Sequence, residues 1–70
     1  MERYKNLSSG IYGYEIGSDY IKVQFKSSSK VYKYSYRKAG HKNVDSMKLL
    51  AIKGSGLNGY INSKVKDLYD

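Results

Sequence analysis

The sequence predicts a small α+β domain: a three-stranded antiparallel β-meander followed by two short helices packed on one face of the sheet. In the first half of the chain, apolar and polar residues alternate with the period of two that is typical of strands. In the second half, apolar residues recur at the three- to four-residue spacing of helices. Seventy residues leave room for one core only. We therefore expect a single domain over residues 1–70, with residues 1–7 as an N-terminal arm and residues 8–69 as the core.

The three expected strands share one apolar face. Residues 8–16 form the first strand, with a β-bulge near Gly13, and a Gly-Ser-Asp turn follows. The second strand, residues 21–26, places on its inner face Ile21, Val23 and Phe25. After a polar hairpin loop, the third strand covers residues 31–37 and continues the inner face with Tyr32, Tyr34 and Tyr36. The outer face then carries Lys22, Gln24, Lys26, Lys33, Ser35 and Arg37. A slip of one residue in register would exchange the two faces and expose the tyrosines.

Two helices are expected in the second half. The first is capped by Asn43 or Asp45 and stops at Gly54. The second runs from residue 57 or 58 to residue 69, after a Ser-Gly hinge. Its apolar stripe consists of Leu57, Ile61, Val65 and Leu68.

The positive charge is concentrated in one continuous third of the chain. The chain has 13 Lys and Arg residues against 6 Asp and Glu residues, for a formal net charge of +7. Between Tyr20 and Val44 lie seven of the basic residues and no acidic residue, whereas the two signs balance elsewhere. Such a field attracts polyanions and acidic surfaces, although surface lysines also serve solubility alone. With two lysines from the last helix, the candidate nucleic-acid-binding residues are Lys22, Lys26, Lys33, Arg37, Lys38, Lys42, Lys64 and Lys66.

Several functional classes are disfavoured by residue content. The chain has no Cys and a single His, which excludes a disulfide framework, a thiolate metal site and a two-His metal site. His41 lies in a connecting segment without a nucleophile elbow or paired carboxylates near it. The longest apolar run, residues 49–52, is far shorter than a membrane helix. We therefore expect a cytoplasmic protein that is not an enzyme, uses no cofactor or metal and contacts no membrane.

The tyrosines allow two interpretations. Nine Tyr against one Phe and no Trp is an unusual aromatic content. Exposed rings would provide stacking surfaces for unpaired bases. Alternation beside the apolar second strand instead favours Tyr32 and Tyr34 as core residues, while the positions of Tyr12 and Tyr20 stay open.

The order and spacing of several segments resemble the KTSC domain family. The matching segments are Ser8-Ser9-Gly10-Ile11, IKVQF at residues 21–25, Tyr32-Lys33-Tyr34, GSGLNGYIN at residues 54–62, Val65-Lys66 and Tyr69. KTSC domains occur at the C-terminus of some lysyl-tRNA synthetases and as stand-alone bacterial and phage proteins. The resemblance implies no catalytic activity and a suggested role in RNA binding.

Charge and resemblance together lead to one expected function and one alternative. We expect a small basic, non-enzymatic domain that binds RNA or single-stranded DNA through phosphates on its Lys-rich surface. The alternative is a protein-interaction module, possible for a phage-encoded domain, that docks on an acidic surface of a host or partner protein. The chain is expected to be a monomer or a homodimer.

Overall fold

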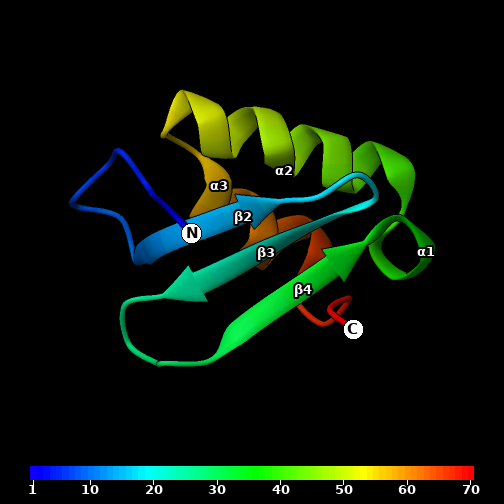
Figure 1. The fold of residues 1–70 in the computed structure, drawn as a ribbon, viewed down its shortest axis with the longest axis horizontal. Helices are drawn as coiled ribbons and strands as arrows, with labels where there is room; N and C mark the ends of the chain where they lie inside the picture. Colours follow the sequence, from blue (N-terminus) through cyan, green and yellow to red (C-terminus); the bar gives the residue numbers. More distant parts are fainter.

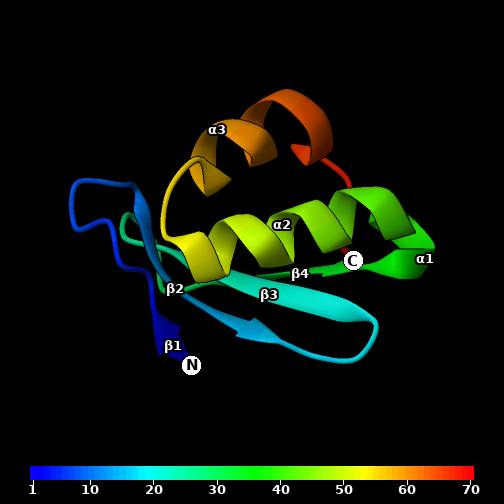
Figure 2. The ribbon, with the colours of Figure 1, turned by 90° about the horizontal axis from the view of Figure 1, so that it is seen from above.

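A four-stranded antiparallel sheet and a helical layer make up the structure, a computed structural model that describes all 70 residues (Figure 1). The strands lie in the order β1-β2-β3-β4. They comprise β1 (Glu2–Arg3), β2 (Ile11–Ile16), β3 (Tyr20–Phe25) and β4 (Val31–Ser35). The helical segments are α1 (Tyr36–Ala39), α2 (His41–Lys53), α3 (Leu57–Tyr60) and the π-helical turn η1 (Ile61–Val65). Figure 2 shows α2, α3 and the turn after it on one side of the sheet, so the other face is uncovered. The predicted α+β class is confirmed, with one more strand than expected.

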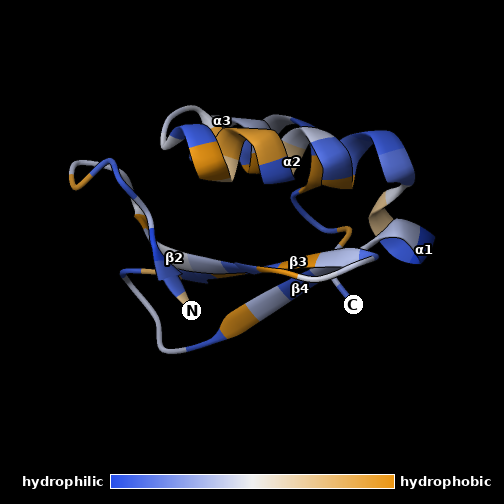
Figure 3. Cartoon of the chain, turned by 45° about the horizontal axis from the view of Figure 1, so that its top comes forward, coloured by the Kyte–Doolittle hydropathy of each residue, from blue (hydrophilic) through white to orange (hydrophobic).

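The core lies between the sheet and the helical layer. Figure 3 shows hydrophobic residues of α2 on the side of the helix that faces the sheet, whereas Leu49 and Ile52 of the same helix are exposed. Ile21 and Val23 of β3 are fully buried, and Tyr34 of β4 is 1% exposed, which confirms the predicted inner face. Phe25 and Tyr32 are only partly buried at the edge of this core. From the helices, the core receives Val44, Met47, Ala51, Leu57, Ile61 and Val65.

The first residues of the chain belong to the domain and do not form an arm. Glu2 and Arg3 pair with Tyr14 and Gly13 of β2. This pairing is close enough that a Cβ at Gly13 would lie 2.6 Å from the carbonyl oxygen of Glu2, so only glycine fits there. The register shifts between Ile11 and Gly13, which confirms the predicted bulge. Tyr4 then enters the core with 2% of its surface exposed.

The third predicted strand is too long by two residues. It ends at Ser35, whose hydroxyl accepts a hydrogen bond from the Lys38 N–H at 3.2 Å and thereby caps α1. Tyr36 and Arg37 consequently belong to α1 and not to the sheet. Tyr36 leaves the expected inner face and donates a hydrogen bond to Asp45 of α2 at 2.5 Å.

The helix boundaries also differ from the sequence predictions. The first long helix starts at His41, because the Val44 N–H already donates to the Gly40 carbonyl at 3.0 Å. Asn43 is not its cap: its side chain donates to the Ala39 carbonyl at 2.8 Å. Gly54 ends α2 as predicted, in the left-handed conformation with φ 85° and ψ 22°.

The last helical segment is shorter than expected. It ends at Val65, and the Asp70 N–H returns to β4, where it donates to the Lys33 carbonyl at 2.7 Å. Leu68 therefore lies outside the apolar stripe and is 37% exposed. None of the helices has both the length and the apolar character that a bilayer-crossing helix requires.

Candidate nucleic-acid interface

The uncovered face of the sheet carries a row of charged residues across three strands. Glu15 of β2 pairs with Lys22 of β3, and Lys22 pairs with Lys33 of β4. Because the Cβ atoms of residues directly opposite each other in antiparallel strands lie about 5 Å apart, the two lysine side chains leave the sheet next to each other. We call this uncovered surface the open face.

Tyr20 organises the charges on the open face. Its hydroxyl donates a hydrogen bond to Glu15 Oε2 at 3.1 Å. Lys33 Nζ lies 4.9 Å and Lys22 Nζ 5.6 Å from the centre of its ring, within the range of cation–π attraction. The hydrogen bond to the Glu15 carboxylate, followed by burial, raises the pKa of Tyr20. The hydroxyl thus stays protonated and holds Glu15 while the ring attracts both ammonium groups.

A second aromatic–cation pair lies on the first two strands. Tyr12 is the extra residue of the β-bulge and is 41% exposed. The guanidinium carbon of Arg3 in β1 lies 4.3 Å from the centre of the Tyr12 ring. On the open face, rings and cations therefore occur together at two places, Arg3–Tyr12 and Tyr20 with its two lysines.

Almost all of the positive charge lacks a carboxylate partner. The structure contains one ion pair, between Lys22 Nζ and Glu15 Oε2 at 3.9 Å, with side chains 38% and 45% exposed. A partly exposed pair at this distance contributes little energy and is readily exchanged. The other twelve Lys and Arg side chains have no carboxylate within 4.0 Å. Their field is consequently available to an external anion.

The structure separates the eight predicted binding residues into several groups. Lys22 and Lys33 lie on the open face as expected. Lys26 follows the end of β3 and donates to the Leu7 carbonyl, and Arg37 and Lys38 lie on α1 at the end of the sheet. The remaining three, on α2, η1 and the turn after it, belong to the helical layer: Lys42, Lys64 and Lys66. The expectation that Lys26 and Arg37 share one strand face with Lys22 and Lys33 is wrong, because both strands end before those residues.

Three residues of the open face were not predicted as site residues: Arg3, Tyr12 and Tyr20. For Tyr20, the signal was present in the alternation, since it precedes Lys22 by two residues and therefore shares its face. The side of the sheet on which Tyr12 lies could not be predicted from the alternation, because the bulge interrupts the period of two. The position of Arg3 on the open face could be predicted only if the pairing of the first residues with β2 were known.

The side-chain arrangement gives little support for a metal site or for a catalytic role of His41. No group of three or more His, Asp and Glu side chains is placed to hold a metal ion. His41 stacks on Tyr36 with ring centres 3.8 Å apart, and Lys48 Nζ lies 3.2 Å from the hydroxyl of the same tyrosine. These contacts fasten α1 to α2. His41 is therefore part of a structural contact.

With this geometry in place, comparison with known proteins adds no relative: no family model, curated protein or solved structure matches the chain.

Proposed function

We propose that this chain is a small non-enzymatic domain that binds single-stranded nucleic acid, RNA or DNA, through phosphates on the open face. The observation that carries the proposal is that Lys22 and Lys33 lie directly opposite each other on neighbouring strands, beside the ring of Tyr20. The only carboxylate paired with either lysine is Glu15, which forms a weak ion pair with Lys22. Like charges placed directly opposite each other weaken a sheet. An external phosphate between the two ammonium groups would relieve that repulsion.

The exposed rings support a single strand over a duplex. Unpaired bases stack on aromatic side chains, and Tyr12 on the open face is 41% exposed. Lysine presents a point charge without the bidentate geometry of arginine, so the proposed binding has little sequence preference. The affinity should therefore fall steeply with salt, with a slope of about −0.7 for each phosphate neutralised.

The wider identity of the chain is part of the same proposal. Membership of the KTSC family rests on the residue resemblance alone, and its suggested role in RNA binding agrees with the basic open face. We further propose that the domain acts in the cytoplasm, as a monomer or homodimer, with no cofactor.

The test compares two double variants that make the same change in charge at different places. Lys22→Glu/Lys33→Glu alters the open face, whereas Lys42→Glu/Lys64→Glu alters exposed lysines of the helical layer. Filter binding of a labelled 20-nucleotide single strand at several salt concentrations gives the affinity of each. We expect the open-face variant to lose at least ten-fold more affinity than the helical-layer variant at the same salt concentration.

Two outcomes would overturn the proposal. Equal losses in the two variants would mean that net charge alone, and not the open face, attracts the strand. Weak binding by the native chain at low salt would remove nucleic acid as the partner. A protein recovered with the tagged domain after nuclease treatment would then support the alternative of an acidic protein partner.

A further inference from the structure

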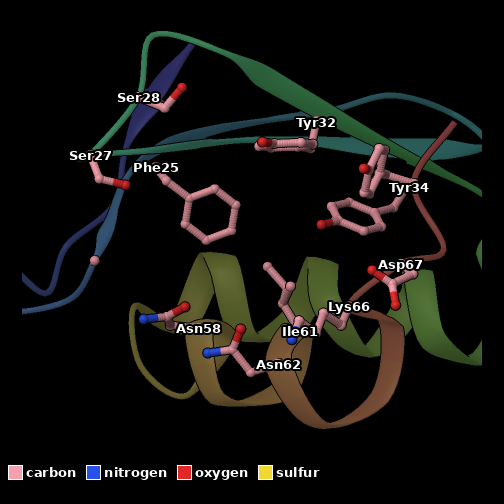
Figure 4. Close-up of a pocket in the computed structure, with 12 residues that line it drawn as sticks. Phe25, Ser27, Ser28, Tyr32, Tyr34, Asn58, Ile61, Asn62, Lys66 and Asp67 are labelled. Atoms are coloured by element: carbon pink, nitrogen blue, oxygen red, sulfur yellow. The ribbon is translucent and has the colours of Figure 1, made fainter.

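A groove lies between the sheet and the last helical segments, on the side opposite the open face. Figure 4 shows Phe25 and Tyr32 on its sheet wall and Asn58, Ile61 and Asn62 on its helical wall. Its volume is about 410 Å³, within the range of small-ligand sites. The groove is distinct from the surface described above and contains residues that no step of the proposed phosphate binding uses.

The sheet wall of the groove is aromatic. The rings of Phe25 and Tyr32 meet edge to face with centres 5.7 Å apart, and Tyr32 meets Tyr69 in the same way at 4.9 Å. Tyr34 closes the inner end of the wall. The pKa of Tyr34 is raised to about 12, chiefly because the side chain is buried, so its hydroxyl stays protonated at neutral pH and can donate a hydrogen bond. This wall offers ring surfaces together with phenol hydroxyls.

The helical wall is polar, and its polar groups are free. The side chains of Asn58 and Asn62 form no hydrogen bond within the chain, whereas those of Asn6 and Asn43 do. Asn58 lies over Gly10, where a Cβ would come within 3.1 Å of its Nδ2 atom. Five of the twelve lining residues are hydrophobic, and the lining contains one positive charge, on Lys66, and one negative charge, on Asp67. Asn58 is half-buried and Asn62 is exposed, so both carboxamides are accessible to a polar occupant of the groove.

We propose that this groove holds one unstacked nucleobase of a bound single strand, between the aromatic wall and the carboxamides of Asn58 and Asn62. A nucleobase is flat and aromatic and has donors and acceptors on its edge, and Asn pairs with such edges. Lys66 would donate a charge-assisted hydrogen bond to the phosphate attached to that base. The inference rests on the proposed nucleic-acid binding and adds to it a site for the base.

The groove and the open face meet at one edge of the sheet. β4 is the edge strand, and its successive residues Tyr32 and Lys33 point to opposite faces. Tyr32 lines the groove, whereas Lys33 lies on the open face. Because Asp70 is bound to the Lys33 carbonyl on this edge, a nucleic-acid strand would pass around it nearer to the start of β4. Its phosphates would then lie near the Lys33 side chain, and one base would turn toward Tyr32.

The test separates base recognition from phosphate binding. A single-stranded 10-mer is compared with an abasic 10-mer of equal length and charge, for the native chain and for Asn58→Ala/Asn62→Ala. Gly59→Ala serves as the matched control, because a Cβ at this position on the same helix meets nothing within 4 Å. Circular dichroism confirms that all three proteins are folded. We expect the native chain and the control to bind the base-bearing strand about ten-fold more tightly than the abasic strand, in line with one stacked base.

For the double variant we expect a clearly smaller preference with unchanged affinity for the abasic strand, because the aromatic wall can still stack the base but the base edge has lost its carboxamide partners. Equal binding of both strands by the native chain would overturn the base site and leave the proposed function intact. Absence of binding to either strand would overturn both. A preference that survives in the double variant but disappears in Tyr12→Ala would place the base on the open face and overturn this inference. The inference would also be overturned by a titration in which the side-chain amide NMR signals of Asn58 and Asn62 shift with N-acetylphenylalanine amide and not with mononucleotides. The groove would then bind an aromatic peptide side chain and not a nucleobase.

Discussion

Replacing Tyr4 by Phe removes one buried hydroxyl and leaves the aromatic ring in place. The Tyr4 hydroxyl accepts a hydrogen bond from the Leu57 N–H at 3.2 Å, a contact that joins the N-terminal segment to the start of α3. Both residues are buried, Tyr4 with 2% and Leu57 with 0% of their surface exposed. The substitution therefore leaves a backbone N–H without a partner and without access to water.

The expected loss follows from that unpaired group. An orphaned buried donor costs about 1–3 kcal/mol. A 70-residue domain has a total unfolding free energy of about 4–10 kcal/mol, so the loss is a large fraction of the whole. The melting temperature should fall by about 4–8 °C for each kcal/mol lost. Tyr4→Ala, which also removes the ring, should cost about 3–5 kcal/mol and bring the domain close to unfolding.

Urea unfolding followed by circular dichroism measures the effect, with Tyr12→Phe as the control. Tyr12 is 41% exposed and its hydroxyl forms no hydrogen bond within the chain, so its removal should change the unfolding free energy by less than about 0.5 kcal/mol. Equal, small effects at the two positions would refute the reasoning, because the N-terminal segment would then contribute no buried hydrogen bond to the fold.

Three further predictions concern the stability of the fold. Because the pKa of folded Tyr34 is raised from 10.0 to about 12, the contribution of Tyr34 to stability should be complete below pH 10 and be lost as the pH rises from 10 to 12, and Tyr34→Phe should reduce that loss in alkaline urea titrations. Gly54→Ala should destabilise the domain by more than about 1 kcal/mol, because Gly54 has a φ of +85° and a Cβ there would lie 2.6 Å from the Lys5 Cβ. Gly59→Ala should stabilise it by about 0.5–1 kcal/mol, because Gly59 is helical and a Cβ there meets nothing within 4 Å. Thermal melts that rank the two variants in the opposite order would contradict this prediction. Lys33→Glu, placed opposite Lys22, should raise stability at low salt by roughly 0.2–1 kcal/mol while it weakens nucleic-acid binding, and a loss in both would count against the like-charge pair.

The sheet was the more predictable part of the fold. Ile21 and Val23 alternate cleanly with polar residues, and burial follows such alternation directly. At Ser35 the alternation no longer predicts the structure: the pattern continues to Tyr36, but the Ser35 hydroxyl caps α1 and the strand ends. A capping side chain overrides periodicity because it provides a partner for an otherwise free backbone N–H.

The parts that were not predicted depend on contacts distant in sequence. Tyr4 is a core residue only because Leu57, more than fifty positions away, presents its N–H to the hydroxyl. Asn58 and Asn62 form a groove wall only because the sheet places aromatic rings opposite them. Local patterns specify the faces of single elements, whereas a groove is produced by two elements together.

The most direct test of the open face as the binding surface is a titration of the isotope-labelled chain with a single-stranded oligonucleotide, followed by amide and side-chain signals in solution. We predict that the largest shifts occur at Tyr20, Lys22 and Lys33, and that they diminish when salt is added. Shifts concentrated on the outer side of α2, with the signals of β3 and β4 unchanged, would contradict the central claim.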